Sequence, residues 1–233
     1  MSVTDIKYIN IVVEDILSEV LLKKVIERVA AAHDVAERYS SQKKSWHEKK
    51  ISKNNSITNE EKHLVGYNTF RRGGSGYIKK NLKGFNNGAK VHPFIVLVDL
   101  DRIECPPALI KEWITFSTND GFFFRVVVRE IESWIMADRI SFADYISISP
   151  EKIPLNIESI EDPKSFLLKL VKDSGNREVK NDMLPGKGST AKIGPLYNES
   201  LAGFIREYWC LEQASKNSRS LERLILRLTE LGK

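Results

Sequence analysis

Acidic residues that suit metal binding follow three apolar segments of the chain, each at the point where the segment ends. They are Glu14 after the first segment, Asp99 and Asp101 after the second, and Glu130 and Glu132 after the third. Carboxylate oxygens are preferred ligands of hard divalent cations such as Mg²⁺, and they also suit Mn²⁺. Because like charges a few ångströms apart resist joint ionisation, such acids need a cation if they converge. The pattern therefore predicts a Mg²⁺ or Mn²⁺ site.

The apolar segments are predicted to be buried strands that bring these acids together. Segments 6–13, 94–98 and 122–128 are apolar on both faces, which is typical of central strands in a parallel sheet. Helix-period patterns follow them, and such alternation favours an α/β fold with right-handed crossovers. The carboxyl ends of parallel strands meet at one edge of the sheet, where ligands bind. Side chains alternate along a strand, so we expect Asp99 and Asp101 on the same side of it.

The pattern of apolar residues divides the chain into two parts. We predict an α/β catalytic domain over residues 1–140, which includes a further strand at 35–39 and a basic insertion at about 40–90. Beyond it, the strand pattern gives way to three helix-period segments. We therefore predict a C-terminal helical subdomain over residues 141–233, packed on the sheet, with a long polar loop at 174–195.

Positive charge is concentrated in the insertion. The chain has 36 Lys and Arg against 31 Asp and Glu, yet residues 43–90 hold twelve Lys or Arg against three Glu. Such a segment fits an anionic partner like nucleic acid, although a solvated loop is an equally simple interpretation. The glycine-rich turn in "RRGGSGYIKK" would let backbone amides approach a phosphate. The residues that we predict to contact nucleic acid are Arg71, Arg72, Lys79, Lys80, Lys83, Lys187 and Lys192.

Composition excludes several other classes of protein. No run approaches the roughly 18 to 20 apolar residues of a membrane helix and no signal peptide is seen, so we expect a cytoplasmic protein without a membrane partner. The two cysteines predict neither a disulfide framework nor a cysteine-based metal site. The four histidines lack the spacing of a zinc site. The glycine-rich segments "GGSGYIKK" and "PGKGSTAKIG" both lack the spacing of an ATP-binding loop.

Three motifs in this order resemble the Toprim domain, a catalytic module of topoisomerases, primases and several nucleases. They are "VVEDILSE" with Glu14, "VLVDLDR" with Asp99 and Asp101, and "VVVREIESWIMADR" with Glu132. The last motif is similar to a prokaryotic branch related to the overcoming-lysogenization-defect nucleases, in which Glu132 is a better match than Glu130. The resemblance spans roughly the first 140 residues.

The resemblance implies a Rossmann-like Toprim fold whose acids bind Mg²⁺ or Mn²⁺ and hydrolyse phosphodiester bonds of DNA or RNA. The residues implied as catalytic are Glu14, Asp99, Asp101 and Glu132. Small proteins of the similar branch often work in anti-phage defence beside an ATPase, so the resemblance also implies an ATPase partner.

The chain departs from the Toprim pattern in two places. Asp15 stands where many members carry glycine, and the insertion before the Asp-x-Asp motif is long. We expect Asp15 to cap the following helix instead. Two other functions stay open. One is a non-catalytic nucleic-acid-binding or adaptor subunit. The other is a phosphatase of the haloacid-dehalogenase kind, because "VLVDLDR" also resembles the nucleophile motif of that family. A phospho-aspartate trapped at Asp99 would support the phosphatase.

Overall fold

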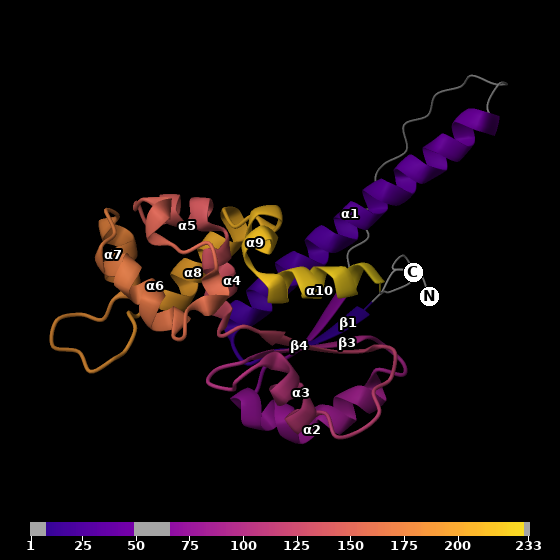
Figure 1. Cartoon of the computed structure of the whole chain (residues 1–233), viewed down its shortest axis with the longest axis horizontal. Helices are drawn as coiled ribbons and strands as arrows, with labels where there is room; N and C mark the ends of the chain where they lie inside the picture. Colours follow the sequence, from indigo (N-terminus) through magenta and orange to yellow (C-terminus); the bar gives the residue numbers. More distant parts are fainter. Residues whose placement is uncertain (1–7, 49–65, 231–233) are drawn as a thin grey trace.

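Four parallel strands form the central sheet of the protein (Figure 1). The computed structural model describes residues 8–48 and 66–230, except for the side chains of 33–48. The strands lie in the order β2-β1-β3-β4, and every neighbouring pair is parallel. This sheet confirms the prediction of an α/β, Rossmann-like fold. The strands are β1 (Tyr8–Val12), β2 (Gly66–Phe70), β3 (Phe94–Asp99) and β4 (Phe122–Val127).

Helices cover both faces of the sheet. α2 (Gly74–Gly88) and α3 (Pro106–Trp113) lie on one face, and α1 (Ile16–Glu48) and α10 (Arg219–Glu230) lie on the other (Figure 1). The far half of α1 extends out of the body of the molecule. No helix within the described ranges is long and apolar enough to cross a bilayer. The other helices gather at one end: α4 (Ile131–Ala137), α5 (Arg139–Tyr145), α6 (Pro163–Lys172), α7 (Arg177–Met183), α8 (Tyr197–Glu207), α9 (Leu211–Asn217) and the short 3₁₀ helices η2 (Pro150–Lys152) and η3 (Ile157–Ser159).

The alternation of side chains along the strands divides the apolar core in two. Ile11 and Ile95 belong to a larger cluster, which also contains residues of α1, α4 and the C-terminal helices. Val12 and Val96, which point to the opposite face, belong to a smaller cluster with residues of α2 and α3. The strands are apolar on both faces because both faces are covered.

The C-terminal helices pack on the sheet through the larger cluster. Trp134 in α4 and Trp209 after α8 are 0% and 2% exposed, so both are core residues. The indole N–H of Trp134 donates to Ser220 Oγ at 2.7 Å, and the indole N–H of Trp209 donates to the backbone oxygen of Trp134 at 3.0 Å. The helical part therefore shares one core with the sheet, and the boundary near residue 140 stays a prediction.

Two segments differ from the sequence prediction. The strand predicted at 35–39 is wrong, because α1 continues through that segment to Glu48. The sheet instead gains β2 from within the basic insertion, and the part of the insertion at 49–65 lies outside the described residues. Helix α7 occupies part of the segment at 174–195 that we expected to be a loop. The other three strands lie close to their predicted positions.

Candidate functional site

Glu14 lies between β1 and α1, at the carboxyl edge of the sheet. Its Oε1 accepts a hydrogen bond of 3.2 Å from the backbone N–H of Asp99, at the end of the neighbouring strand β3. The backbone N–H of Ser75 also lies near the Glu14 carboxylate and lowers its pKa slightly. Ser75 stands at the start of α2, after Gly73 and Gly74, whose φ values of 66° and 59° are left-handed and favour glycine. The glycine-rich turn thus faces Glu14 with a backbone amide.

Asp99 lies among other carboxylates, as the sequence predicted for the strand ends. Part of the residue is exposed, but protein atoms surround its carboxyl group. Burial raises the pKa of Asp99 well above its usual range, and four nearby carboxylates add to this effect. In order of their effect, these are Asp15, Glu132, Glu14 and Asp101. Acids far apart in sequence therefore converge at this edge of the sheet.

Asp101 lies just beyond the end of β3, in a turn, and is exposed. Its φ of 51° is left-handed, so the alternation of side chains expected for a continuous strand does not extend to it. The backbone N–H groups of Leu100 and Asp101 both donate to the oxygen of Arg129, at 2.9 and 3.0 Å. This turn joins the ends of β3 and β4 and keeps Asp101 close enough to raise the pKa of Asp99.

Glu132 is the most deeply buried acid of the group, with 1% of its surface exposed. Its Oε1 accepts a hydrogen bond of 3.0 Å from Tyr197 Oη and lies 3.3 Å from Lys164 Nζ. Its Oε2 is buried and has no hydrogen-bond partner among the described residues. Burial raises the pKa of Glu132, while the Lys164 ammonium opposes that shift. One carboxylate oxygen of Glu132 therefore has partners, from α6 and α8, and the other has none among the described residues.

Two neighbouring acids bond to the ends of helices. Asp15 Oδ1 accepts a hydrogen bond of 2.8 Å from the backbone N–H of Ser18, which confirms its expected role as a cap of α1. Glu130 Oε2 accepts a hydrogen bond of 3.0 Å from the backbone N–H of Lys164, in the first turn of α6. Both acids have structural roles that need no metal.

The acidic cluster has the donor chemistry of a hard-cation site. Burial and mutual repulsion oppose the ionisation of Asp99, and Mg²⁺ or Mn²⁺ would relieve that repulsion, while Glu132 Oε2 has no other partner among the described residues. Within the described ranges, however, no three Asp, Glu, His or Cys side chains are arranged to hold an ion. The residues fit such a cation in chemistry and charge, and their side chains would have to move to complete its coordination.

Arg71 and Arg72 are the predicted nucleic-acid contacts that lie at the same edge as the acids. They follow β2, whose last residue pairs with the last residue of β1, and both are exposed. Arg71 Nε lies 3.4 Å from Glu19 Oε2 in the first turn of α1. Both residues therefore lie beside the Glu14 end of the sheet.

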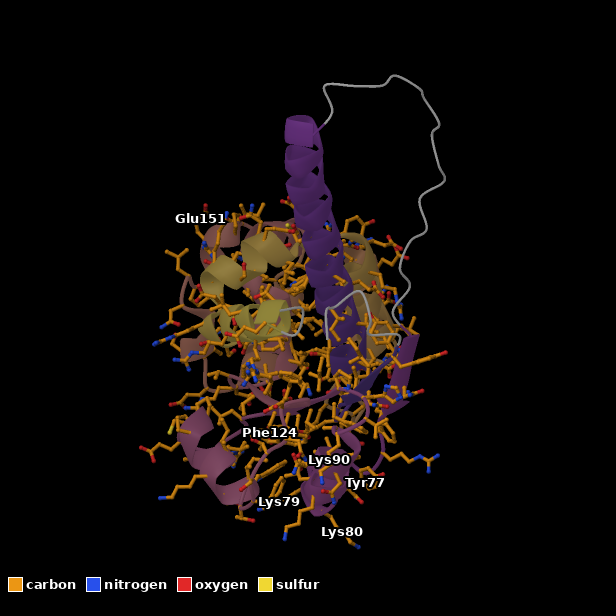
Figure 2. All side chains as sticks on the ribbon, turned by 90° about the vertical axis from the view of Figure 1, so that its right-hand side faces the viewer. Tyr77, Lys79, Lys80, Lys90, Phe124 and Glu151 are labelled. Atoms are coloured by element: carbon orange, nitrogen blue, oxygen red, sulfur yellow. The ribbon has the colours of Figure 1, made fainter. Side chains whose placement is uncertain are left out.

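The other predicted contacts lie in two separate places. Lys79, Lys80 and Lys83 are exposed on α2, at the bottom of Figure 2, where Lys79 and Lys80 are labelled. Lys79 Nζ is already 2.5 Å from an oxygen of Glu112 in α3. The last two contacts lie in the loop between α7 and α8, at the left end of Figure 1, and the side chains of both are exposed: Lys187 and Lys192.

The fold and the site together define an α/β protein with a Rossmann-like parallel sheet and an acidic carboxyl edge. Comparisons with protein-family models, with curated proteins and with solved structures found no match for this chain.

Lys164 and Tyr197 are site residues that the sequence analysis missed. Lys164 is the second residue of α6, directly after Pro163, and Tyr197 is the first residue of α8. A lysine in the first turn of a helix is ordinarily solvated, and a tyrosine in an apolar pattern is ordinarily a core residue. Only their contacts with Glu132 distinguish them, so no local pattern could have found them.

The raised pKa of Glu14 predicts a pH dependence of stability for the metal-free protein. Burial, with Asp101 and Asp15, raises this pKa from 4.5 to about 7. Between these values the folded protein holds a proton that the unfolded chain has lost, so the free energy of unfolding should fall as pH rises. We expect Glu14 to contribute a fall of about 2 kcal/mol after allowance for solvent screening.

Urea denaturation in EDTA at pH 5 and pH 8 would measure this fall. Asp99 and Glu132 contribute in the same direction, so the Glu14→Gln variant should show a smaller fall than the wild type, not a flat profile. Glu222→Gln, an exposed position on α10, is the matched control and should behave as the wild type. Equal falls in the wild type and Glu14→Gln would contradict the prediction.

Proposed function

We propose that this protein is a divalent-metal-dependent nuclease of the Toprim type, which hydrolyses phosphodiester bonds of DNA or RNA. The observation that carries the proposal is the convergence of Glu14 and Asp99 at the carboxyl edge of a parallel sheet, in repulsive contact with further acids. Uncompensated carboxylates at the ligand-binding edge of such a sheet suit a cation that binds phosphate. The Toprim-like order of the three motifs supports the same assignment.

Glu14, Asp99, Asp101 and Glu132 are the residues that would hold Mg²⁺ or Mn²⁺, with Glu130 as the second choice to Glu132. Such a cation, when bound, lowers the pKa of a water molecule and neutralises charge on the phosphate. The backbone N–H of Asp99 orients Glu14. All of these carboxylates act as ligands in the proposed reaction, and none acts as a nucleophile.

Lys164 and the exposed arginines extend the proposed site toward the substrate. The ammonium of Lys164 fixes Glu132 and keeps 44% of its side chain exposed, so it is also placed to face an anion. Arg71 and Arg72 would contact the phosphates of the bound strand from the β2 side. A role in anti-phage defence, with an ATPase as partner, belongs to the proposal through the Toprim resemblance alone.

A non-catalytic nucleic-acid-binding subunit is the second candidate. The contacts of Glu132 Oε1 with Tyr197 and Lys164 favour it, because they give the acid a structural duty. Nucleic-acid binding that persists in EDTA, without cleavage of any substrate, would favour this candidate over the nuclease.

Cleavage of labelled DNA and RNA in the presence of Mn²⁺ tests the proposal. The wild-type protein should cut at least one substrate, and EDTA should stop the reaction. Asp99→Ala should reduce the rate by at least about a thousandfold, because it removes a central ligand. Equal cleavage by the wild type and Asp99→Ala would show that a different site, or a contaminant, performs the reaction.

A further inference from the structure

A pocket lies beside β4, the strand at one edge of the sheet. It is bounded by α3 on one face of the sheet and by the start of α10 on the other (Figure 1). Its volume of about 410 Å³ is in the range of sites for small organic ligands. We call it the arginine pocket, after Arg125, Arg219 and Arg223 in its lining.

The arginine pocket carries a net positive charge. Neither Arg219 nor Arg223 forms an ion pair within the part of the chain that the structure describes, although both line the pocket. Glu158 is the only acid in the lining. Its Oε1 accepts hydrogen bonds of 2.7 Å from the backbone N–H of Ser220 and of 2.6 Å from Ser220 Oγ. This carboxylate is held by the start of α10, and the lining keeps a net positive charge, with three arginines against one glutamate.

Arg125 adds a buried donor that lacks an acceptor. Its Nε is buried and has no hydrogen-bond partner among the described residues, while a terminal nitrogen donates to the backbone oxygen of Phe124 at 3.1 Å. Burial and the nearby Arg227 guanidinium both lower the pKa of Arg125, while the Glu230 carboxylate opposes that shift. An unsatisfied buried donor and a like-charge neighbour each cost free energy, and a bound anion would relieve both.

The remaining lining suits the rest of a nucleotide. Pro106 and Ile110 of α3 give the pocket an apolar wall, and Asn156 contributes an exposed amide that can both donate and accept. Guanidinium groups bind phosphate through paired hydrogen bonds, and apolar walls accept the face of a base. Both kinds of group line one pocket.

We propose that the arginine pocket binds a nucleoside phosphate, with the phosphate on Arg219 and Arg223 and the base against Pro106 and Ile110. The same chemistry is presented by a free nucleotide and by the 5′-terminal nucleotide of a strand. The proposal goes beyond the nuclease function and does not depend on it, because none of the carboxylates of the candidate metal site lines this pocket.

Isothermal titration calorimetry in EDTA, with 5′-AMP, adenosine and a 5′-phosphorylated single-stranded hexanucleotide, tests this site. We expect binding of at least one phosphorylated probe and no binding of adenosine. Arg219→Gln and Arg223→Gln are at exposed positions and should keep the fold, yet each should weaken binding by about tenfold. Arg206→Gln, exposed on α8 outside the pocket, is the matched control and should bind as the wild type does.

The outcomes distinguish a strand end from a free nucleotide as the source of the phosphate. They also distinguish failure of this proposal from failure of the nuclease proposal. Tighter binding of the hexanucleotide than of 5′-AMP assigns the site to a strand end, and equal or weaker binding assigns it to the free nucleotide. Asp99→Ala should bind as the wild type does, so a failed nuclease assay leaves this result intact. Absence of binding by both phosphorylated probes, or unchanged binding in Arg219→Gln and Arg223→Gln, would overturn the proposal.

Discussion

Replacing Glu14 by glutamine should abolish metal-dependent cleavage while the protein stays folded. Glutamine keeps the length of the side chain, and its amide oxygen can still accept from the backbone N–H of Asp99. The change removes the negative charge that a divalent cation requires of a ligand. We expect the rate to fall by at least about a thousandfold, which corresponds to roughly 4 kcal/mol of transition-state stabilisation. Cleavage of labelled substrates in Mn²⁺ measures the rate, and thermal unfolding checks the fold.

Asp15→Asn is the matched control for this experiment. It removes the same charge from the adjacent residue, but asparagine caps helices as well as aspartate does, so the hydrogen bond from Ser18 should persist. The rate should stay within about threefold of the wild type, a difference below 1 kcal/mol. If Glu14→Gln and Asp15→Asn lost activity equally, the total charge at this edge would matter, and Glu14 would not be a specific ligand.

Replacing Lys164 by methionine should destabilise the protein by about 2 to 3 kcal/mol near neutral pH. The ammonium compensates the carboxylate of Glu132, which is 1% exposed, and a buried charge left without its partner is costly. The figure lies below the roughly 3 to 5 kcal/mol of fully buried pairs, because 44% of the Lys164 side chain is exposed. The cost should shrink as pH falls, since protonation of Glu132 removes the uncompensated charge.

A double-mutant cycle would separate this pair from a general effect of α6. Glu132→Gln combined with Lys164→Met should recover much of the lost free energy of unfolding, because no buried charge then remains. Lys172→Met, exposed at the end of the same helix, should change stability by less than about 0.5 kcal/mol. Similar losses in Lys164→Met and Lys172→Met, or an unchanged loss when Glu132→Gln is added, would contradict the assignment.

The sequence predicted those strands that are buried on both faces. β3 is a continuous apolar run, and every residue of it but Asp99 is buried, so its pattern has one interpretation. β2 lies at the other extreme: as an edge strand it exposes Asn68 and Thr69, and its short polar sequence resembles a loop. The false strand at 35–39 arose because a short apolar segment fits a helix as well as a strand.

The same contrast holds for the candidate site. Glu14 and Asp99 directly follow or end buried strands, so local patterns and the geometry of parallel sheets predicted that they would meet. Asp101 follows the same strand, but its left-handed turn depends on contacts with Arg129 that the sequence does not display. The contacts of Lys164 with Glu132 join distant segments through tertiary packing, which no motif in a single sequence encodes.

The larger core cluster also determines whether the acidic site could form in a shorter fragment of the chain. Apolar residues of α1 and α4, within the first 140 residues, pack in this cluster with residues of α8, α9 and α10. A fragment that ended near residue 140 would expose those faces to water and would lose both Lys164 and Tyr197, the partners of Glu132. The helices after residue 140 therefore complete the core around the motifs that resemble Toprim, and we expect that residues 1–140 alone would not form the acidic site.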